Sequence, residues 1–302
     1  MLKLSEGLFP VLITPLKNDE IDFEYLRRLI DEIQKLEYVS GFWALGTGAE
    51  EFGLTHAQKL LLIDFFSEIK GEVKPLILGI NSATFSDSLK LADYARDKSF
   101  SYVHYMPSNR VISGSLVIEH YKMVKERLGE SIDLWGYHSD NFSATFGFDE
   151  VKILRDENVL SGVKYSTKNI LSLQKVAGLK SENFSIISAV LKTMRASFGI
   201  GLTGLTSVEL CGLHRWIHKI YAYYRAGDNS RYHAEFFRLL EFLDGFPPGA
   251  AGDNFQRVAE IKYLLEMQGF PRSRVVPGLR DLSDKQRSEI SAYVESYPEL
   301  WS

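Results

Sequence analysis

Lys164 lies in an apolar segment, residues 160–165, where a charged side chain is out of place. Burying an ammonium group among apolar neighbours is costly, so we expect the pKa of this amine to be lowered. A neutral amine is a nucleophile, and its expected chemistry is a Schiff base with a carbonyl compound. Spacing alone leaves a second interpretation open, in which Lys164 only reaches solvent from the end of a strand.

Tyr137 closes the preceding apolar run, so we expect it to neighbour Lys164. A phenol beside a Schiff-base lysine can pass protons to and from a substrate. A tyrosine is more often a packing residue, and the chain has 15 of them. The catalytic interpretation of Tyr137 therefore depends on the lysine beside it.

The turn Gly46-Thr47-Gly48 follows an apolar run and precedes a predicted helix. Such a turn exposes backbone N–H groups and a hydroxyl that suit a carboxylate. The chain continues Ala49-Glu50 without the third glycine of a dinucleotide fingerprint, and it contains no Walker-type phosphate loop. We therefore predict no nucleotide or other cofactor.

A metal site is also not predicted. His214 and His218 are four residues apart in a predicted helix, but the glutamate of a zinc-protease helix is missing between them. A surface or interface role is favoured for this pair. Glu50 and Glu51 are adjacent, so their side chains should point apart on a helix or strand and do not form a paired-carboxylate site.

The elements that must position these residues are eight short apolar runs that alternate with amphipathic stretches. The runs are residues 9–16, 40–46, 75–80, 102–106, 132–138, 160–165, 184–189 and 199–205. Helices are predicted between them at residues 23–35, 56–70, 86–97, 115–128, 148–156 and 169–177. This alternation predicts an α/β fold, a (β/α)8 TIM barrel. An open, doubly wound sheet would alternate in the same way.

The pattern after residue 205 is purely helical. Helices are predicted at residues 208–225, 230–243, 254–268 and 283–296. The first of these can serve as the eighth barrel helix, and the other three exceed what a barrel needs. We therefore predict a barrel domain at residues 1–225 and a C-terminal helical extension at residues 226–302.

Active sites of such barrels lie at the carboxyl ends of the strands. The polar residues that end or follow the apolar runs are therefore the candidates, and they are Thr14, Thr47, Asn81, Ser108, Tyr137, His138, Lys164 and Thr203.

Composition excludes several classes of protein. The 302 residues are 45% hydrophobic and 25% charged, which is typical of a soluble globular protein. A formal net charge of −4 argues against nucleic-acid binding through a basic surface. The single cysteine, Cys211, fits a reducing cytoplasm. No signal peptide and no membrane-spanning segment are predicted.

Several motifs occur together in an order and at separations that resemble one family. They are Thr14-Pro15, Gly46-Thr47-Gly48-Ala49-Glu50, Tyr137, Gly162-Val163-Lys164, Gly269-Phe270-Pro271 and Val276-Pro277-Gly278-Leu279. Nearly the whole chain is similar to the dihydrodipicolinate synthase/N-acetylneuraminate lyase superfamily. The resemblance implies a (β/α)8 barrel with C-terminal helices, a homo-oligomer (dimer or tetramer) and class I aldolase chemistry without a metal.

The resemblance also implies roles for individual residues. Lys164 would form the Schiff base with pyruvate or another 2-keto acid, and Tyr137 would act as general acid and base. Thr47, with the N–H groups around Gly48, would hold the substrate carboxylate. Further substrate contacts are expected from Thr14, His138 and the glycine-containing turn after the eighth strand, which includes Gly201 and Thr203.

The sequence departs from the family pattern at four places. Gly48 replaces a second threonine, and Ser108 or Asn109 stands where many members have a tyrosine. His138 begins a polar loop in place of Asn-x-Pro, and Phe142 replaces an arginine. Loss of that guanidinium removes a bidentate carboxylate clamp and argues against dihydrodipicolinate synthesis. Water or His138 would have to replace the missing hydroxyls.

The sequence thus predicts a Schiff-base lyase or aldolase for a 2-keto acid, or a dehydratase of a keto-deoxy sugar acid. The alternative is a family member that has lost efficient turnover and binds a keto acid as a sensor or scaffold.

Overall fold

A computed structural model describes residues 4–108, 110–254 and 256–301 of the chain. Asn109, one of the two positions considered for the missing tyrosine, lies outside the described residues. The chain forms two compact units, and each is assembled from separate stretches of sequence. The first comprises the chain up to Phe9 and residues 40–46 and 55–206, and the second comprises residues 10–39, 47–54 and 207 onward.

Eight strands form one sheet, in the order β1-β10-β9-β8-β7-β6-β5-β4. They are β1 (Gly7–Pro10), β4 (Phe42–Ala44), β5 (Leu76–Gly79), β6 (Tyr102–Tyr105), β7 (Asp133–Ser139), β8 (Gly162–Ser166), β9 (Ser185–Ser188) and β10 (Gly204–Ser207). The strand pairs from β4 to β10 are parallel. The Ser40 N–H donates to the Leu8 oxygen at 2.9 Å, which joins the two ends of the sheet. The predicted (β/α)8 barrel is therefore confirmed.

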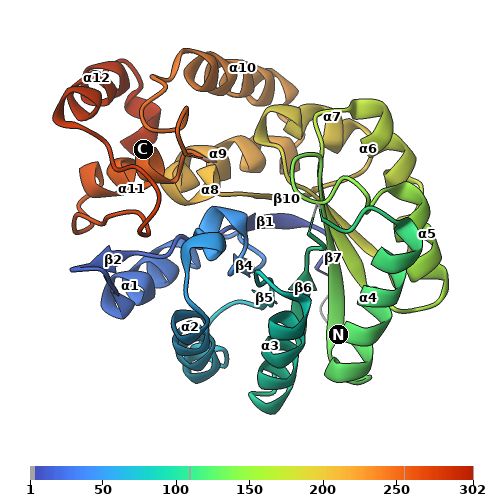
Figure 1. Ribbon diagram of the computed structural model, residues 1–302. Helices are drawn as coiled ribbons and strands as arrows, with labels where there is room; N and C mark the ends of the chain where they lie inside the picture. The colour runs from blue at the N-terminus through green and yellow to red at the C-terminus, as the bar shows by residue number, and fades with distance from the viewer. Residues whose placement is uncertain (1–3, 109, 255, 302) are drawn as a thin grey trace. The chain divides into compact units, whose positions relative to one another are not determined.

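Helices of the first unit lie outside the strands (Figure 1). They are α2 (His56–Ile69), α3 (Phe85–Asp97), α4 (Gly114–Leu128), α5 (Phe148–Asp156), α6 (Ile170–Ala177) and the short α7 (Met194–Gly199). Thr55 caps α2 in a capping box with Gln58, and Asn169 caps α6. Such caps satisfy N–H groups that a helix start leaves free, so side-chain chemistry fixes where each helix begins.

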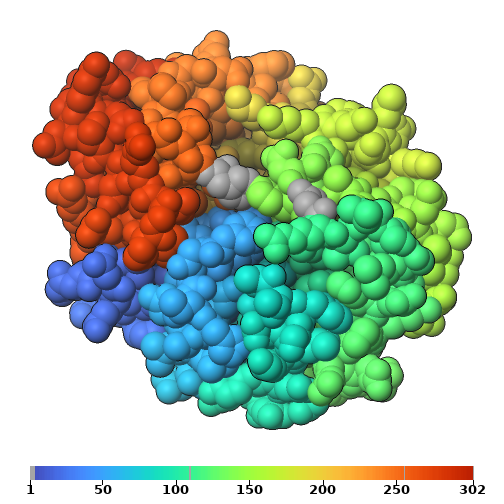
Figure 2. All heavy atoms as spheres, viewed as in Figure 1, coloured from blue at the N-terminus to red at the C-terminus, as the bar shows by residue number. Residues whose placement is uncertain are grey.

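Helices dominate the second unit. They are α1 (Phe23–Ile33), α8 (Glu209–Gly212), α9 (His214–Arg225), α10 (Asn229–Gly245), α11 (Val258–Met267) and α12 (Asp284–Val294), with a small hairpin of β2 (Leu16–Lys17) and β3 (Glu20–Ile21). Aromatic side chains join the later helices, and Figure 2 shows these orange and red segments packed together. The Phe242 ring lies 5.6 Å from Trp216 and 5.0 Å from Tyr297. Among the described residues no helix combines the length and apolarity needed to cross a membrane.

Two predicted elements are displaced. The first strand is Gly7–Pro10, whereas the apolar run spans residues 9–16. The eighth is Gly204–Ser207 instead of residues 199–205, because α7 and the turn after it occupy the start of that run. The predicted boundary at residue 225 coincides with the end of α9, which belongs to the second unit. The C-terminal helices therefore group with α1 and with the turn at Thr47.

Candidate active site

Lys164 lies in the middle of β8, where it is only 3% exposed. Its register partners are Tyr137 on β7 and Ile187 on β9. Nζ lies 4.0 Å from the centre of the Tyr137 ring and 4.9 Å from that of the Trp43 ring. Trp43 belongs to β4, which is distant from β8 in the sheet order, so these side chains meet inside the barrel. Lys164 does not extend into solvent.

The aromatic enclosure acts on this amine in two opposing ways. Ring faces attract a cation at these distances, which favours the ammonium form. Removal from water favours the neutral amine. An amine is a nucleophile toward a carbonyl carbon when it is neutral.

His104 of β6 is a second buried titratable group near the lysine. Its ring stacks on Trp43 with 4.3 Å between centroids, and Nε2 donates to the Ala44 oxygen at 3.0 Å. Burial lowers the His104 pKa well below its usual value, and the charge of Lys164 lowers it further. His104 is thus neutral at pH 7. A Cβ at Gly79 would lie 2.7 Å from its ring, so a glycine is needed there.

Sequence reasoning missed Trp43 and His104. Both lie in apolar runs that predict strands correctly, and an aromatic ring in such a run reads as core. Alternation along the strands was the signal that could have found His104. Trp135 and Tyr137 are two residues apart on β7 and share a face, and His104 is in register with Trp135, so its ring lies on the same face of the sheet as Tyr137.

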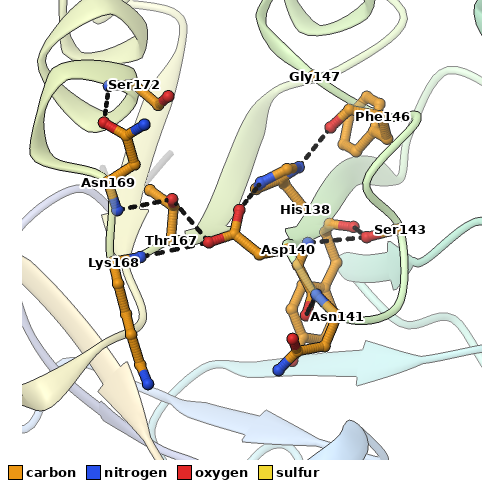
Figure 3. Close-up of polar contacts among 12 residues, drawn as sticks. His138, Asp140, Asn141, Ser143, Phe146, Gly147, Thr167, Lys168, Asn169 and Ser172 are labelled. Carbon is orange, nitrogen blue, oxygen red and sulfur yellow. Dashed lines mark hydrogen bonds and ion pairs between the residues drawn. The ribbon is translucent and has the colours of Figure 1, made fainter.

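His138 lies on the opposite face of β7 from Tyr137, because neighbouring residues of a strand alternate. Its ring stacks on its register partner Tyr165 at 4.0 Å between centroids. Figure 3 shows its two nitrogens directed to the Phe146 oxygen, at 2.6 Å, and to Asp140 Oδ1, at 3.0 Å. The structure does not bring His138 together with Lys164 and Tyr137.

Asp140 connects the loop after β7 with the loop after β8. Its Oδ2 accepts hydrogen bonds from the Thr167 hydroxyl at 2.9 Å and from the Lys168 N–H at 3.3 Å (Figure 3). The Thr167 hydroxyl in turn accepts from the N–H of Asn169, the cap of α6. Asp140 therefore links the loops that follow the two strands carrying the tyrosine and the lysine.

Thr47 and Gly48 begin a short 3-10 turn of the second unit, η1 (Thr47–Ala49), and are buried. The Thr14 hydroxyl donates to the Ala49 oxygen at 2.6 Å, so the structure brings Thr14 to this turn. Gln256 Nε2 donates to Thr47 Oγ1 at 3.1 Å. Gln256 was not among the candidates, because it falls in the helix predicted at residues 254–268 and nothing in that pattern brings it to this turn; the observed helix α11 begins only at Val258.

A fully buried ion pair supports the same turn. Glu50, at φ +62° in the left-handed region, lies 2.5 Å from Lys262 Nζ and accepts from the Val276 N–H at 3.0 Å. Lys262 also donates to the oxygens of Thr14 and Arg274, at 2.8 and 2.6 Å. Burial raises the Glu50 pKa and lowers the Lys262 pKa, and each charge partly offsets the shift of the other.

Gly201 and Thr203 were expected after the eighth strand, but they precede β10. They therefore lie at the amino end of a parallel strand, opposite to the end where barrels place their active sites. Gly201 is exposed and its oxygen accepts from Lys180. The prediction of their position is wrong, and the turn after the eighth strand begins after Ser207.

His214 is a buried structural residue. Its Nδ1 donates to the Cys211 oxygen at 2.7 Å, and its Nε2 faces Glu32 at 3.7 Å. Nowhere in the described part of the chain do three or more histidine, cysteine or acidic side chains gather as metal ligands would.

Comparison with known proteins identifies the family. The model of the dihydrodipicolinate synthetase family matches residues 4–297. A 4-hydroxy-tetrahydrodipicolinate synthase of Oceanobacillus iheyensis is 21% identical over 296 residues, covering 95% of both chains. The enzyme of the same name from Parabacteroides distasonis is 26% identical over 281 residues, covering 89% of both.

Solved structures share the fold. YagE, a prophage protein from E. coli K12 solved in complex with pyruvate, has a TM-score of 0.86 at 18% identity, covering 96% of this chain and 98% of that one. The sialic acid aldolase of Ruminococcus gnavus has a TM-score of 0.88 at 14% identity, covering 99% of each chain. With the family model matching almost the full length, this chain belongs to the dihydrodipicolinate synthetase family.

Proposed function

We propose that this protein is a class I aldolase or lyase that forms a Schiff base between Lys164 and pyruvate or another 2-keto acid. The observation that carries the proposal is the buried Lys164 amine, enclosed by the Tyr137 and Trp43 rings. Membership of a family of class I aldolases and lyases supports it. So does the pyruvate complex of the structural relative YagE.

The reaction begins when the neutral Lys164 amine attacks the keto carbon. Loss of water from the resulting carbinolamine leaves a protonated imine, which withdraws electrons from the neighbouring carbon. Removal of the proton from the C4 hydroxyl and cleavage of the C3–C4 bond give an aldehyde and an enamine. The enamine takes up a proton at C3 and becomes the imine again, and the reverse steps give condensation. Dehydration of a 4-hydroxy-2-keto acid would use the same imine: loss of a proton from C3 gives an enamine, which expels the C4 hydroxyl as water once that oxygen is protonated. Water finally hydrolyses the imine and frees the lysine.

Tyr137 moves the protons in this scheme, and Thr47 with the N–H groups of the Gly48 turn binds the substrate carboxylate. Thr14 supports that turn, because its own hydroxyl donates to the Ala49 oxygen. We assign no proton transfer to His138, because its ring is on the other face of β7 and both nitrogens are engaged. Phe142 stands in place of a carboxylate-clamping arginine, so we propose a substrate other than that of dihydrodipicolinate synthases. No observation on the described residues favours the sensor or scaffold alternative.

Borohydride reduction tests the first step. Pyruvate with sodium borohydride should add a stable adduct to the intact protein, and peptide mapping should place it on Lys164. No adduct with pyruvate or any small 2-keto acid would reject the proposal. An adduct without turnover on any keto acid, aldehyde pair or keto-deoxy sugar acid would instead establish the binding-only alternative.

Tyr137→Phe should lower kcat by about 10²- to 10⁴-fold, the usual contribution of a general acid–base group. Borohydride trapping on Lys164 should persist, because the phenol moves protons whereas the amine forms the bond. Tyr165→Phe is the matched control, since Tyr165 lies on the opposite face of the neighbouring strand. Equal losses of kcat in both variants would contradict the role of Tyr137.

A further inference from the structure

Lys168 lies two residues beyond β8, the strand that carries Lys164, and both lysines belong to the first unit. Neighbouring residues of an extended chain alternate between the two faces of a sheet. Tyr165 stacks on the His138 ring, and the Thr167 hydroxyl donates to the carboxylate that His138 contacts. These two side chains are therefore on the His138 face. Continued beyond the strand, the alternation places Lys168 on the other face, which is the face of Lys164.

The backbone around Lys168 is held by two hydrogen bonds to side chains. Its own N–H donates to Asp140 Oδ2 at 3.3 Å, and the Asn169 N–H donates to the Thr167 hydroxyl at 3.1 Å. Figure 3 shows the Lys168 side chain directed away from these bonds, to the same side as the side chain of Asn141. The lysine thus extends from a fixed base.

The positive charge of Lys168 is not engaged by the protein. Its side chain is exposed, and its ammonium forms no hydrogen bond, ion pair or ring contact within the part of the chain that the structure describes. Other lysines of this unit are engaged. Lys152 pairs with Asp156 at 2.7 Å. Lys175 lies over the Phe148 ring at 4.4 Å. Lys168 therefore has a charge available for a ligand.

The spacing of Lys164 and Lys168 indicates which ligand both can bind. Four residues of extended chain separate the two Cα atoms by about 13 Å. Barrel enzymes bind their substrates at the carboxyl ends of the strands, and Lys168 is the further out of the two in that direction. A keto acid longer than pyruvate by several carbon atoms can therefore hold its keto carbon at Lys164 and an acidic end group at Lys168.

We propose that Lys168 determines substrate specificity by binding a second acidic group, a carboxylate or a phosphate, at the far end of a 2-keto acid that reacts with Lys164. This inference rests on the proposed function and names its substrate class, a 2-keto acid with two anionic ends. An ammonium is a compact point charge that binds either anion. Lys168 contributes charge to binding and takes no part in bond breaking at Lys164.

Two matched pairs of ligands test the two anions. 2-Oxoheptanedioate and 2-oxoheptanoate differ in the terminal carboxylate, and a 2-keto-3-deoxy sugar acid is compared with and without a terminal phosphate. The concentration for half-maximal borohydride trapping on Lys164 should be about tenfold lower for the doubly anionic member of the pair whose end group is bound. The difference should shrink as the salt concentration is raised.

Lys168→Met should bring the two half-maximal concentrations of that pair together, by raising the value for the doubly anionic ligand. Lys168→Glu should reverse their order, because two anions repel, and Lys168→Arg should retain the preference. Lys175→Met is the matched control, because Lys175 is an exposed lysine of α6 whose amine already lies over Phe148. Its preference should equal that of the wild type.

Equal half-maximal concentrations within both pairs in the wild type would overturn the inference. A preference that persists in Lys168→Met, or that Lys175→Met also removes, would overturn it too. In all these cases the wild type still traps keto acids on Lys164, so the proposed function is retained. A wild-type protein that traps no 2-keto acid would overturn both proposals.

Discussion

Lys164→Met should abolish borohydride trapping and lower kcat/KM by at least about 10⁴-fold, equivalent to roughly 5.5 kcal/mol. The proposed reaction proceeds through a bond to Nζ of Lys164, so removal of this nitrogen removes the nucleophile. The variant loses two contributions to catalysis at once. The substrate is no longer held by a covalent bond, and no protonated imine forms to withdraw electrons, because both require the Nζ atom of Lys164.

The thermal stability of Lys164→Met should not fall with its activity. Lys164 is buried against the faces of Tyr137 and Trp43. A methionine fills similar space there and requires no burial of a charge. We therefore expect the Tm of Lys164→Met to equal or exceed that of the wild type. Unchanged circular dichroism would show that lost activity reflects lost chemistry.

Lys175→Met is the matched control for this variant. Lys175 also lies over an aromatic ring, with Nζ 4.4 Å from the Phe148 centre, but its side chain is exposed. Trapping and kcat/KM should remain at wild-type levels. If Lys164→Met retains an adduct that maps to another lysine, the assignment of the nucleophile is wrong.

The barrel could be predicted from the sequence because its strands are covered on both faces and therefore form uniform apolar runs. That uniformity also limits the prediction. An apolar run carries no period, so residues 199–205 gave no sign that α7 ends there and that β10 begins only at Gly204. Gly201 and Thr203 were placed at the wrong end of the strand as a result.

The tyrosine–lysine pair was predictable for a related reason. Consecutive parallel strands lie side by side, so chain order brought Tyr137 next to Lys164. Gln256 reaches Thr47 by long-range packing, and no local pattern specifies such a contact. His138 looked functional because it follows Tyr137, but alternation puts it on the opposite face of β7.

Lys262→Met should destabilise the protein by about 3–5 kcal/mol, the usual effect of removing one partner of a buried ion pair. Lys262 is 1% exposed, and its amine neutralises Glu50 and binds the backbone oxygens of Thr14 and Arg274. Without it, a buried carboxylate and two carbonyls lose their donor. Thermal unfolding should show a fall in Tm of roughly 10 °C.

A double-mutant cycle separates this charge effect from lost packing. Glu50→Gln alone leaves the buried ammonium without its counter-charge and should also destabilise. In Glu50→Gln/Lys262→Met neither charge remains, so the double variant should lose clearly less stability than the sum of the two single variants. Additive losses would mean that the two side chains stabilise the fold independently.

Lys285→Met provides the control, because Lys285 is 86% exposed and its nitrogen lies 3.8 Å from Glu289 on α12. An exposed pair of this kind should contribute within about 0.5 kcal/mol. The contrast follows from burial: at the surface, water replaces the lost partner, whereas the buried Glu50 would keep the Val276 N–H but lose its counter-charge. The Thr47 turn should then loosen in Lys262→Met, and the half-maximal pyruvate concentration for trapping should rise even well below the Tm.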